Sequence, residues 1–186
     1  MKKYFTLLSA AMILLAACNN NSQKTEASAT DNTTSSGGQE QVQDDVSQKD
    51  VVKIAVGSKD HTTLVAALKQ AELVTSLANA GPFTVFAPTN AAFEKLPPGT
   101  VEGLMKDDKK ADLQNILQYH VTTSSFTTAM LQDGMNLGMV NGDNVTVSVK
   151  DGKIILNGSA TIVATVPASN GIVHVIDAVL LPPAKK

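Results

Sequence analysis

Hydrophobic and polar positions divide the chain into three stretches. An apolar run, residues 7–17, follows two lysines near the start, and residues 19–48 are then almost entirely polar. Hydrophobic positions recur through nearly all of the remaining sequence. The polar stretch buries too little apolar surface to offset the entropy of ordering it. The pattern therefore predicts one folded domain over residues 51–183, preceded by a disordered polar tether over residues 18–50 and followed by a tail, residues 184–186.

The first half of the predicted domain has the spacing of helices. Three sets of apolar positions recur at intervals of three and four residues, which is typical of one face of a helix. Ser58 and Asp60 are candidate caps for the first set, and Gly81-Pro82 ends the second. Asp107 or Asp108 is expected to open the third. The sets are Leu64, Leu68 and Ala71; Leu73, Leu77 and Ala80; and Leu113, Ile116, Leu117 and His120.

The second half has the spacing of strands. Val145, Val147 and Val149 alternate with polar residues, so one face of this strand is expected to be buried. The pair Asp151-Gly152 follows, and an Asp-Gly link between two such runs is typical of a tight hairpin turn. Further strands are expected over residues 83–87, 161–166 and 172–181. The expected class is α+β, with a helical first half packed against an antiparallel sheet.

Composition and charge narrow the classes of function. The chain has 186 residues, of which 43% are hydrophobic, and a formal charge of −2. All 15 basic residues are lysine. Because arginine is the usual reader of phosphate and guanine, its absence argues against a nucleic-acid partner. The one cysteine, Cys18, leaves no second thiol for a disulfide within the chain.

The start of the chain predicts export. Two lysines, an apolar run and small residues before Cys18 have the order of a secretory signal. The run Leu15-Ala16-Ala17-Cys18 resembles the lipobox of bacterial lipoproteins, which implies removal of residues 1–17 and lipidation of Cys18. An ordinary secretory signal is the alternative, whereas a permanent membrane-spanning helix would need about 20 apolar residues. Asn19 follows Cys18 in the place where an Asp would mark retention, and this resembles the sorting pattern for the Gram-negative outer membrane. The sequence leaves open whether the domain lies on the periplasmic or the surface face.

Three motifs carry a resemblance to a known family. They occupy residues 81–93, 117–121 and 170–182, and their order and spacing resemble the two hallmark blocks and the central Tyr-His motif of the fasciclin, or FAS1, domain. The resemblance implies a wedge-shaped β-sandwich with helices packed along one side. It also implies a secreted or surface-bound protein associated with adhesion and extracellular matrix.

The Tyr-His motif supplies the candidate interaction site, Leu117, Tyr119, His120 and Val121. In animal relatives this region is associated with integrin binding, which the resemblance carries to these four positions. The alternative is structural, because His120 falls on the apolar helix face with Leu113 and would then be a neutral histidine bonded within the fold.

Six other motif residues are interpreted as structural. Phe86 and Phe93 are expected core anchors, and Thr89 and Asn90 are candidate caps of a short helix. His174 and Asp177 are expected to be polar groups of a strand or its edge whose hydrogen bonds are satisfied within the fold. Asn90 is also expected to bond to loop backbone.

Catalytic patterns are missing from the sequence. The three histidines have no partner at metal-ligand spacing, and neither a phosphate loop nor a nucleophile elbow occurs. We therefore expect no enzyme, metal or cofactor. The favoured function is a lipid-anchored adhesion or binding module for a cell-surface or matrix protein or polysaccharide. The alternative is a carrier that holds a small apolar ligand between sheet and helices, and a hydrolase ranks last.

Overall fold

The computed structural model describes residues 48–183. The signal, Cys18 and nearly all of the polar tether lie outside the described residues. The helices are α1 (Val51–Val56), α2 (Thr62–Gln70), α3 (Val74–Ala78), α4 (Asn90–Glu94), α5 (Thr100–Leu104) and α6 (Lys110–Gln118), with 3-10 turns η2 (Lys59–His61), η3 (Asp107–Lys109) and η4 (Thr128–Met130). The strands are β1 (Phe83–Pro88), β2 (Val121–Thr122), β3 (Asn136–Gly138), β4 (Asn144–Lys150), β5 (Lys153–Leu156), β6 (Ala160–Ala168) and β7 (Gly171–Ile176).

The strands form one sheet in the order β2-β1-β7-β6-β5-β4-β3. Every pairing is antiparallel except that of β1 with β7, which is parallel from Phe83↔Gly171 to Pro88↔Ile176. The sheet was expected to be antiparallel throughout, and this was wrong for the pair β1 and β7. A parallel pair needs a long connection, and here most of the domain lies between the two strands.

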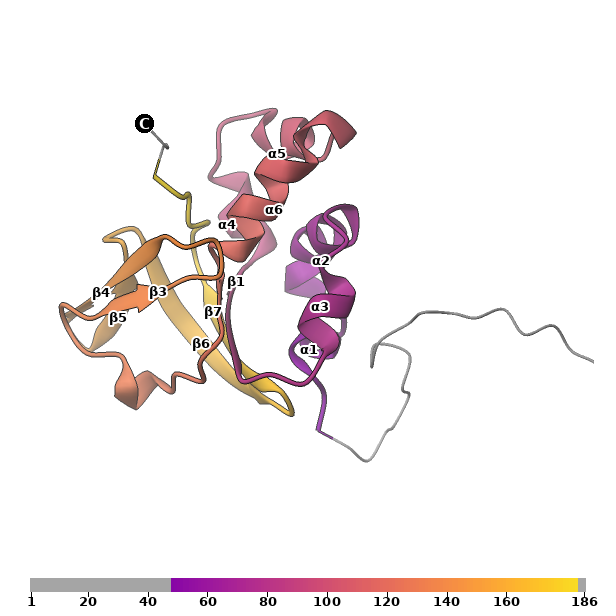
Figure 1. Cartoon of the computed structure of the whole chain (residues 1–186). Helices are drawn as coiled ribbons and strands as arrows, with labels where there is room; N and C mark the ends of the chain where they lie inside the picture. Colours follow the sequence, from indigo (N-terminus) through magenta and orange to yellow (C-terminus); the bar gives the residue numbers. More distant parts are fainter. Residues whose placement is uncertain (1–47, 184–186) are drawn as a thin grey trace, which may run out of the picture. The chain divides into compact units, whose positions relative to one another are not determined.

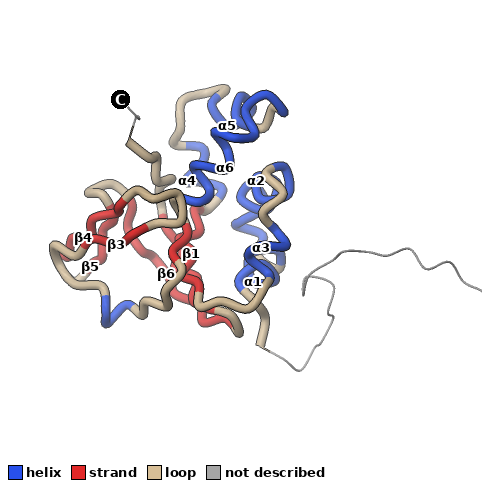
Figure 2. The backbone as a smooth tube through the Cα atoms, viewed as in Figure 1, coloured by secondary structure: helices blue, strands red, loops and turns tan. Residues whose placement is uncertain are grey.

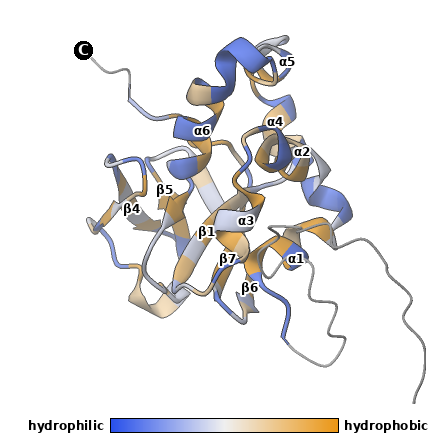
Figure 3. Cartoon of the chain, turned by 45° about the vertical axis from the view of Figure 1, so that its right-hand side comes forward, coloured by the Kyte–Doolittle hydropathy of each residue, from blue (hydrophilic) through white to orange (hydrophobic). Residues whose placement is uncertain are grey.

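The sheet separates two hydrophobic clusters. Figure 1 shows the helices on one side of β1 and β7, and β3, β4 and β5 on the other. Successive side chains of a strand point to opposite faces, so Val85 joins the cluster under the helices and Phe86 joins the one between the two parts of the sheet. Hydrophobic residues gather where these layers meet (Figure 3). The predicted α+β architecture, a sandwich with helices along one side, is confirmed.

The three predicted helices are present as α2, α3 and α6, but their caps differ in part from expectation. The Ser58 hydroxyl accepts the N–H of Asp60 and so caps η2, the turn that precedes α2. Asp107 and Asp108 lie in η3, and neither carboxylate caps α6. The Asp107 carboxylate instead accepts a bond of 2.8 Å from the side chain of Gln70. Expecting either aspartate as the cap was therefore wrong.

The turn chemistry of the second half agrees with the sequence. Asp151 and Gly152 have φ values of 50° and 72°, as a two-residue hairpin turn requires. The last strand is shorter than expected, since β7 ends at Ile176. There Asp177 accepts the N–H of Thr161 at 2.7 Å through its side chain, and the chain leaves the sheet. Figure 2 shows the long loop segment around η4 at the lower left, below the β3–β5 part.

Candidate interaction site around the Tyr-His motif

Tyr119 and His120 follow directly on the last residue of α6. The N–H of Tyr119 donates to the carbonyls of Asn115 and Ile116, and that of His120 donates to the carbonyl of Leu117. These bonds close the helix and turn the chain into β2. Both side chains lie in the interior, with 2% of Tyr119 and 3% of His120 exposed.

The Tyr119 hydroxyl joins three segments of the chain. It donates to the carbonyl of Asn144 at 2.9 Å and accepts from the amide of Asn157 at 2.8 Å. Asn157 lies in the turn between β5 and β6 with a φ of 48°, and its side-chain oxygen accepts the N–H of Thr146. Tyr119 therefore ties the end of α6 to the far part of the sheet.

His120 ties the same helix end to the C-terminal segment. Its Nε2 accepts the N–H of Leu180 at 3.0 Å, so the proton is on Nδ1, which donates to the carbonyl of Ile116 at 2.8 Å. Burial lowers the pKa of His120 to about 4, against a smaller raising effect of the Ile116 carbonyl. The ring is therefore neutral near pH 7.

The two flanking residues of the motif are interior as well. Leu117 and Val121 belong to the cluster under the helices and are 5% and 6% exposed. All four candidate residues, Tyr119 and His120 included, thus have structural contacts in this conformation. Their role in adhesion stays a prediction, and a partner at the surface would first meet other residues beside them.

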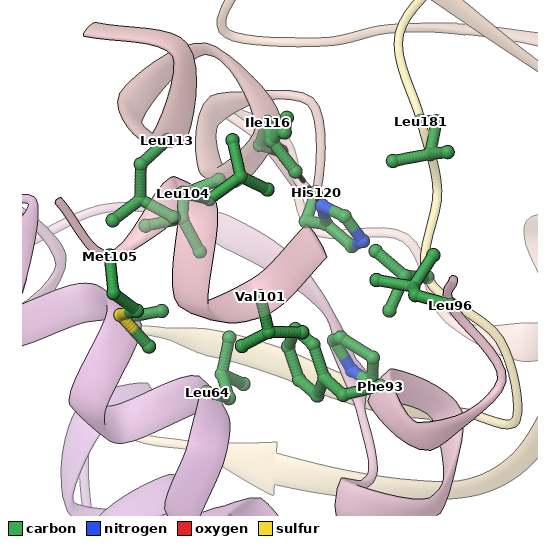
Figure 4. A pocket seen from close by; sticks show the side chains of 14 residues that line it. Leu64, Phe93, Leu96, Val101, Leu104, Met105, Leu113, Ile116, His120 and Leu181 are labelled. Atoms are coloured by element: carbon green, nitrogen blue, oxygen red, sulfur yellow. Dashed lines mark hydrogen bonds between the residues drawn. The ribbon is translucent and has the colours of Figure 1, made fainter. Parts of the chain in front are cut away.

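A small apolar cavity lies on the His120 side of the motif. Figure 4 shows its lining, with side chains from α2, α5 and α6 pointing inward and Phe93, Leu96 and Leu181 beside the His120 ring. The cavity has only about 30 Å³ of free space. Pockets that bind small molecules hold about 300–1,000 Å³. A carrier ligand therefore does not fit here without movement of the helices.

A more open groove lies on the opposite side, where Leu117 and Val121 form its floor. Its free space is about 230 Å³. Leu73 and Leu77 of the α3 region form one wall, and Val140, which is 45% exposed, lies on the rim. The remaining lining residues are Ser76, Phe83, Gln118 and Thr123. We call this the α3–α6 groove.

Asn170 fixes one wall of the groove, a role that the sequence did not reveal. It is 8% exposed, and its amide donates to the carbonyls of Leu77 and Asn79 at 2.8 and 2.9 Å. Its side-chain oxygen accepts the N–H of Val51 at 2.9 Å. In the sequence Asn170 opens the motif over residues 170–182 and stands before Gly171, a pair that resembles an ordinary turn.

Thr89 and Asn90 organise the start of two helices. The Thr89 hydroxyl accepts the N–H of Ala92 and caps α4. The Asn90 side chain accepts the N–H of Thr63 at 3.0 Å and donates to the carbonyl of Lys59 at 3.0 Å. Asn90 therefore holds the start of α2 against α4 through loop backbone.

Phe86 and His174 lie stacked under the sheet, with ring centroids 5.6 Å apart. His174 is fully buried, and its Nε2 lies 2.8 Å from the carbonyl of Phe126, so Nε2 carries the proton. Its Nδ1 then accepts from the Thr165 hydroxyl at 2.8 Å. Burial lowers the pKa of His174, with a smaller opposing effect of the Phe126 carbonyl.

Asp177 and Lys95 meet at the end of β7. The Lys95 ammonium donates to the Asp177 carbonyl at 2.6 Å and lies 4.0 Å from its carboxylate. Both side chains are well exposed, so this pair contributes little to stability. Together with the bond to the N–H of Thr161, it marks the point where the chain leaves the sheet.

The third histidine, His61, lies apart from these two. Its Nδ1 is 2.8 Å from the hydroxyl of Ser58, and burial lowers its pKa. Within residues 48–183, no three His, Cys, Asp or Glu side chains are placed to hold a metal ion together. In that same range no helix is both long and apolar enough to cross a membrane.

Comparison with known proteins gives the family. The Fasciclin domain model matches residues 59–182. The chain is 49% identical over 137 residues to Protein sll1483 of Synechocystis sp., covering 74% of this chain and 76% of that protein. It is 34% identical over 145 residues to Cell surface glycolipoprotein MPB83 of Mycobacterium bovis, covering 75% and 64%. It also resembles the solved FAS1 domain pair of the insect cell adhesion molecule Fasciclin I, with a TM-score of 0.64 at 21% identity, covering 72% of this chain and 51% of that one. The chain belongs to the fasciclin domain family.

Proposed function

We propose that the protein is a non-catalytic binding module of the cell envelope, anchored through a lipid on Cys18, which contacts a cell-surface or matrix protein or polysaccharide through the α3–α6 groove. The proposal rests first on family membership, since a solved relative is described as a cell adhesion molecule and another relative as a cell surface glycolipoprotein. Those descriptions belong to the relatives and give the class of function that we extend to this chain.

The observation that carries the proposal is the position of the groove. It joins the Tyr-His motif to the surface, because Leu117 and Val121 form its floor while the exposed Val140 forms its rim. The N–H of Val140 donates to the carbonyl of Val121 at 2.9 Å, which fixes the rim against the motif. An apolar groove with a few polar groups on its edge is typical of a contact site for a partner.

The groove also favours a binding module over a carrier. The cavity beside His120 has about 30 Å³ of free space, whereas the groove has about 230 Å³. Each of the three described histidines lies in the interior and is bonded to backbone or to a hydroxyl. Both ring nitrogens of His120 and of His174 are bonded within the fold, which supports surface contact as the function.

The groove is tested by placing a charge on its rim. Val140→Lys puts an ammonium at the apolar contact, and Val56→Lys makes the same change at another exposed valine, on α1 and outside the groove. We expect Val140→Lys to weaken retention on immobilised envelope polysaccharide or matrix protein about tenfold or more, and Val56→Lys to leave it unchanged. Equal retention of wild type and Val140→Lys would contradict the groove as the contact.

The anchor is tested separately. Cells fed labelled palmitate should label the wild-type protein, and Cys18→Ala should abolish the label and release the protein from membranes, because several acyl chains hold a protein at a bilayer far more firmly than one. Label that persists in Cys18→Ala would contradict lipidation at Cys18. Protease added to intact cells then distinguishes the periplasmic from the surface face of the outer membrane.

A further inference from the structure

The segment over residues 97–105, which contains α5, is bonded to itself rather than to the rest of the domain. The N–H of Gly103 donates to the carbonyl of Gly99 at 2.8 Å, and that of Met105 donates to the carbonyl of Val101 at 3.0 Å. None of the α5 residues is buried. Among the described residues, no hydrogen bond or ion pair joins this segment to another helix or to the sheet. Apolar contact alone therefore holds α5 against the domain.

The chain on either side of this segment is fixed by hydrogen bonds. Before it, the Lys95 ammonium donates to the carbonyl of Asp177 at 2.6 Å, and after it, Asp107 accepts the 2.8 Å bond from Gln70. Gly99 lies between these points with a φ of 81°, in the left-handed region that favours glycine. A cover that is bonded only within itself, between fixed ends, opens at a lower free-energy cost than the bonded helices around it.

This segment separates two spaces. On its inner side Val101, Leu104 and Met105 line the apolar cavity beside His120. On its outer side lies an open hollow with about 360 Å³ of free space, which is within the range of small-molecule sites. The wall between the two is made of residues that line both, namely Phe93, Leu96 and Val101. All three lie beside the cavity in Figure 4. An outward movement of α5 takes Val101 out of this wall and joins the cavity to the hollow.

The inner and outer spaces differ in chemistry. Every side chain that lines the cavity is apolar except that of His120, and both of its ring nitrogens are already bonded. The hollow has two exposed carboxylates, those of Glu94 and Glu102, and no lysine among its lining residues. The joined site is therefore apolar at its inner end and negatively charged at its mouth.

We propose that α5 opens as a lid and that the joined site binds a single-chain amphiphile with a cationic head. The tail passes the position of Val101 into the cavity, where its removal from water stabilises the complex. The ammonium head stays in the hollow with the carboxylates of Glu94 and Glu102, which attract it modestly because they are exposed. The site is distinct from the α3–α6 groove, which lies on the other side of Leu117.

Hydrogen exchange of the full chain, resolved to single amides, tests the lid. The chain carries Cys18→Ala, so that no acyl group at the proposed anchor competes for the site. We expect the Gly103 and Met105 amides to exchange about tenfold faster or more than the Leu117 amide inside α6. Decyltrimethylammonium, added below its micelle concentration, should slow the first two amides about tenfold or more and leave Leu117 unchanged.

Calorimetry with matched probes tests the chemistry of the site. Decyl sulfate has the same tail with an anionic head, and tetramethylammonium has the head without the tail. We expect one decyltrimethylammonium to bind per chain, about threefold or more tightly than decyl sulfate, and tetramethylammonium to show no binding. Glu94→Gln with Glu102→Gln should remove the preference for the cationic head. Asp108→Asn with Asp151→Asn removes two exposed carboxylates outside the hollow and should leave the preference intact.

Four results would overturn the site. The first is Gly103 and Met105 amides that exchange no faster than Leu117 or that the probe does not slow. The second is equal affinity of the wild type for the two decyl probes, and the third is a cationic preference that survives Glu94→Gln with Glu102→Gln. The fourth is loss of binding in Val140→Lys, which would place the amphiphile in the α3–α6 groove. Unchanged binding in Val140→Lys supports a site separate from the proposed contact.

Discussion

Replacing His120 by phenylalanine tests its role as a neutral interior bond acceptor. Phenylalanine fills similar space but cannot accept the buried N–H of Leu180. The Ile116 carbonyl, which accepts from His120 Nδ1, keeps one hydrogen bond in the variant because it also accepts the N–H of Tyr119. An unsatisfied buried donor costs about 1–3 kcal/mol. We therefore expect His120→Phe to lower the free energy of unfolding by that amount near pH 7.

The same substitution has a pH signature. His120 binds a proton near pH 6.5 when unfolded but only near pH 4 when folded. Between these values the unfolded state holds more protons, so the wild type loses stability as pH falls. From about pH 7.5 to about pH 4.5 the loss from this group is about 2–3 kcal/mol. The variant lacks the group, so its stability deficit should shrink by that amount and nearly vanish.

Urea unfolding followed by circular dichroism at the two pH values measures this, since the chain has no tryptophan. Carboxylates affect wild type and variant alike and cancel in the difference. Tyr119→Phe is the matched control, because it removes a bonded hydroxyl next to His120 and leaves the imidazole in place. A His120→Phe deficit that stays constant with pH would refute the neutral, buried imidazole.

Three further substitutions test the scaffold of the site, each by urea unfolding. Tyr119→Phe should cost about 1 kcal/mol at either pH, through its lost bonds to Asn144 and Asn157; no loss would show that the hydroxyl does not join these segments. Asn170→Ala should cost about 2–4 kcal/mol because it leaves buried backbone groups unpaired, and a cost under about 0.5 kcal/mol would show that water replaces it. Gly171→Ala should cost several kcal/mol or prevent folding, because its Cβ would collide with the backbone of Phe83; a soluble variant of unchanged stability would contradict the close β1–β7 approach.

Local sequence patterns predicted the elements whose signals are local. The alternation gave a strand whose Val145 and Val147 are buried, although Val149 near its end is 38% exposed, and the Asp151-Gly152 pair gave its turn. Helix α5 had no such signal, because it is only five residues long and none of them is buried.

Pairing between distant segments had no local signal. Whether β1 and β7 run parallel depends on the connection between Pro88 and Gly171, which the spacing within either strand does not encode. The groove of the candidate site likewise depends on contacts between distant segments. The motif residues were found from the sequence, whereas the groove needs α3, the end of α6 and Val140, which only the fold brings together.

The proposed contact through the α3–α6 groove is tested most directly by photo-crosslinking in intact cells. A benzoylphenylalanine at Val140 on the groove rim is compared with the same residue at Val56 on α1, both at exposed valines. We predict that light joins the Val140 probe to a discrete envelope protein or polysaccharide and leaves the Val56 probe unjoined. The same adducts from both positions, or none from Val140, would contradict the groove as the binding site.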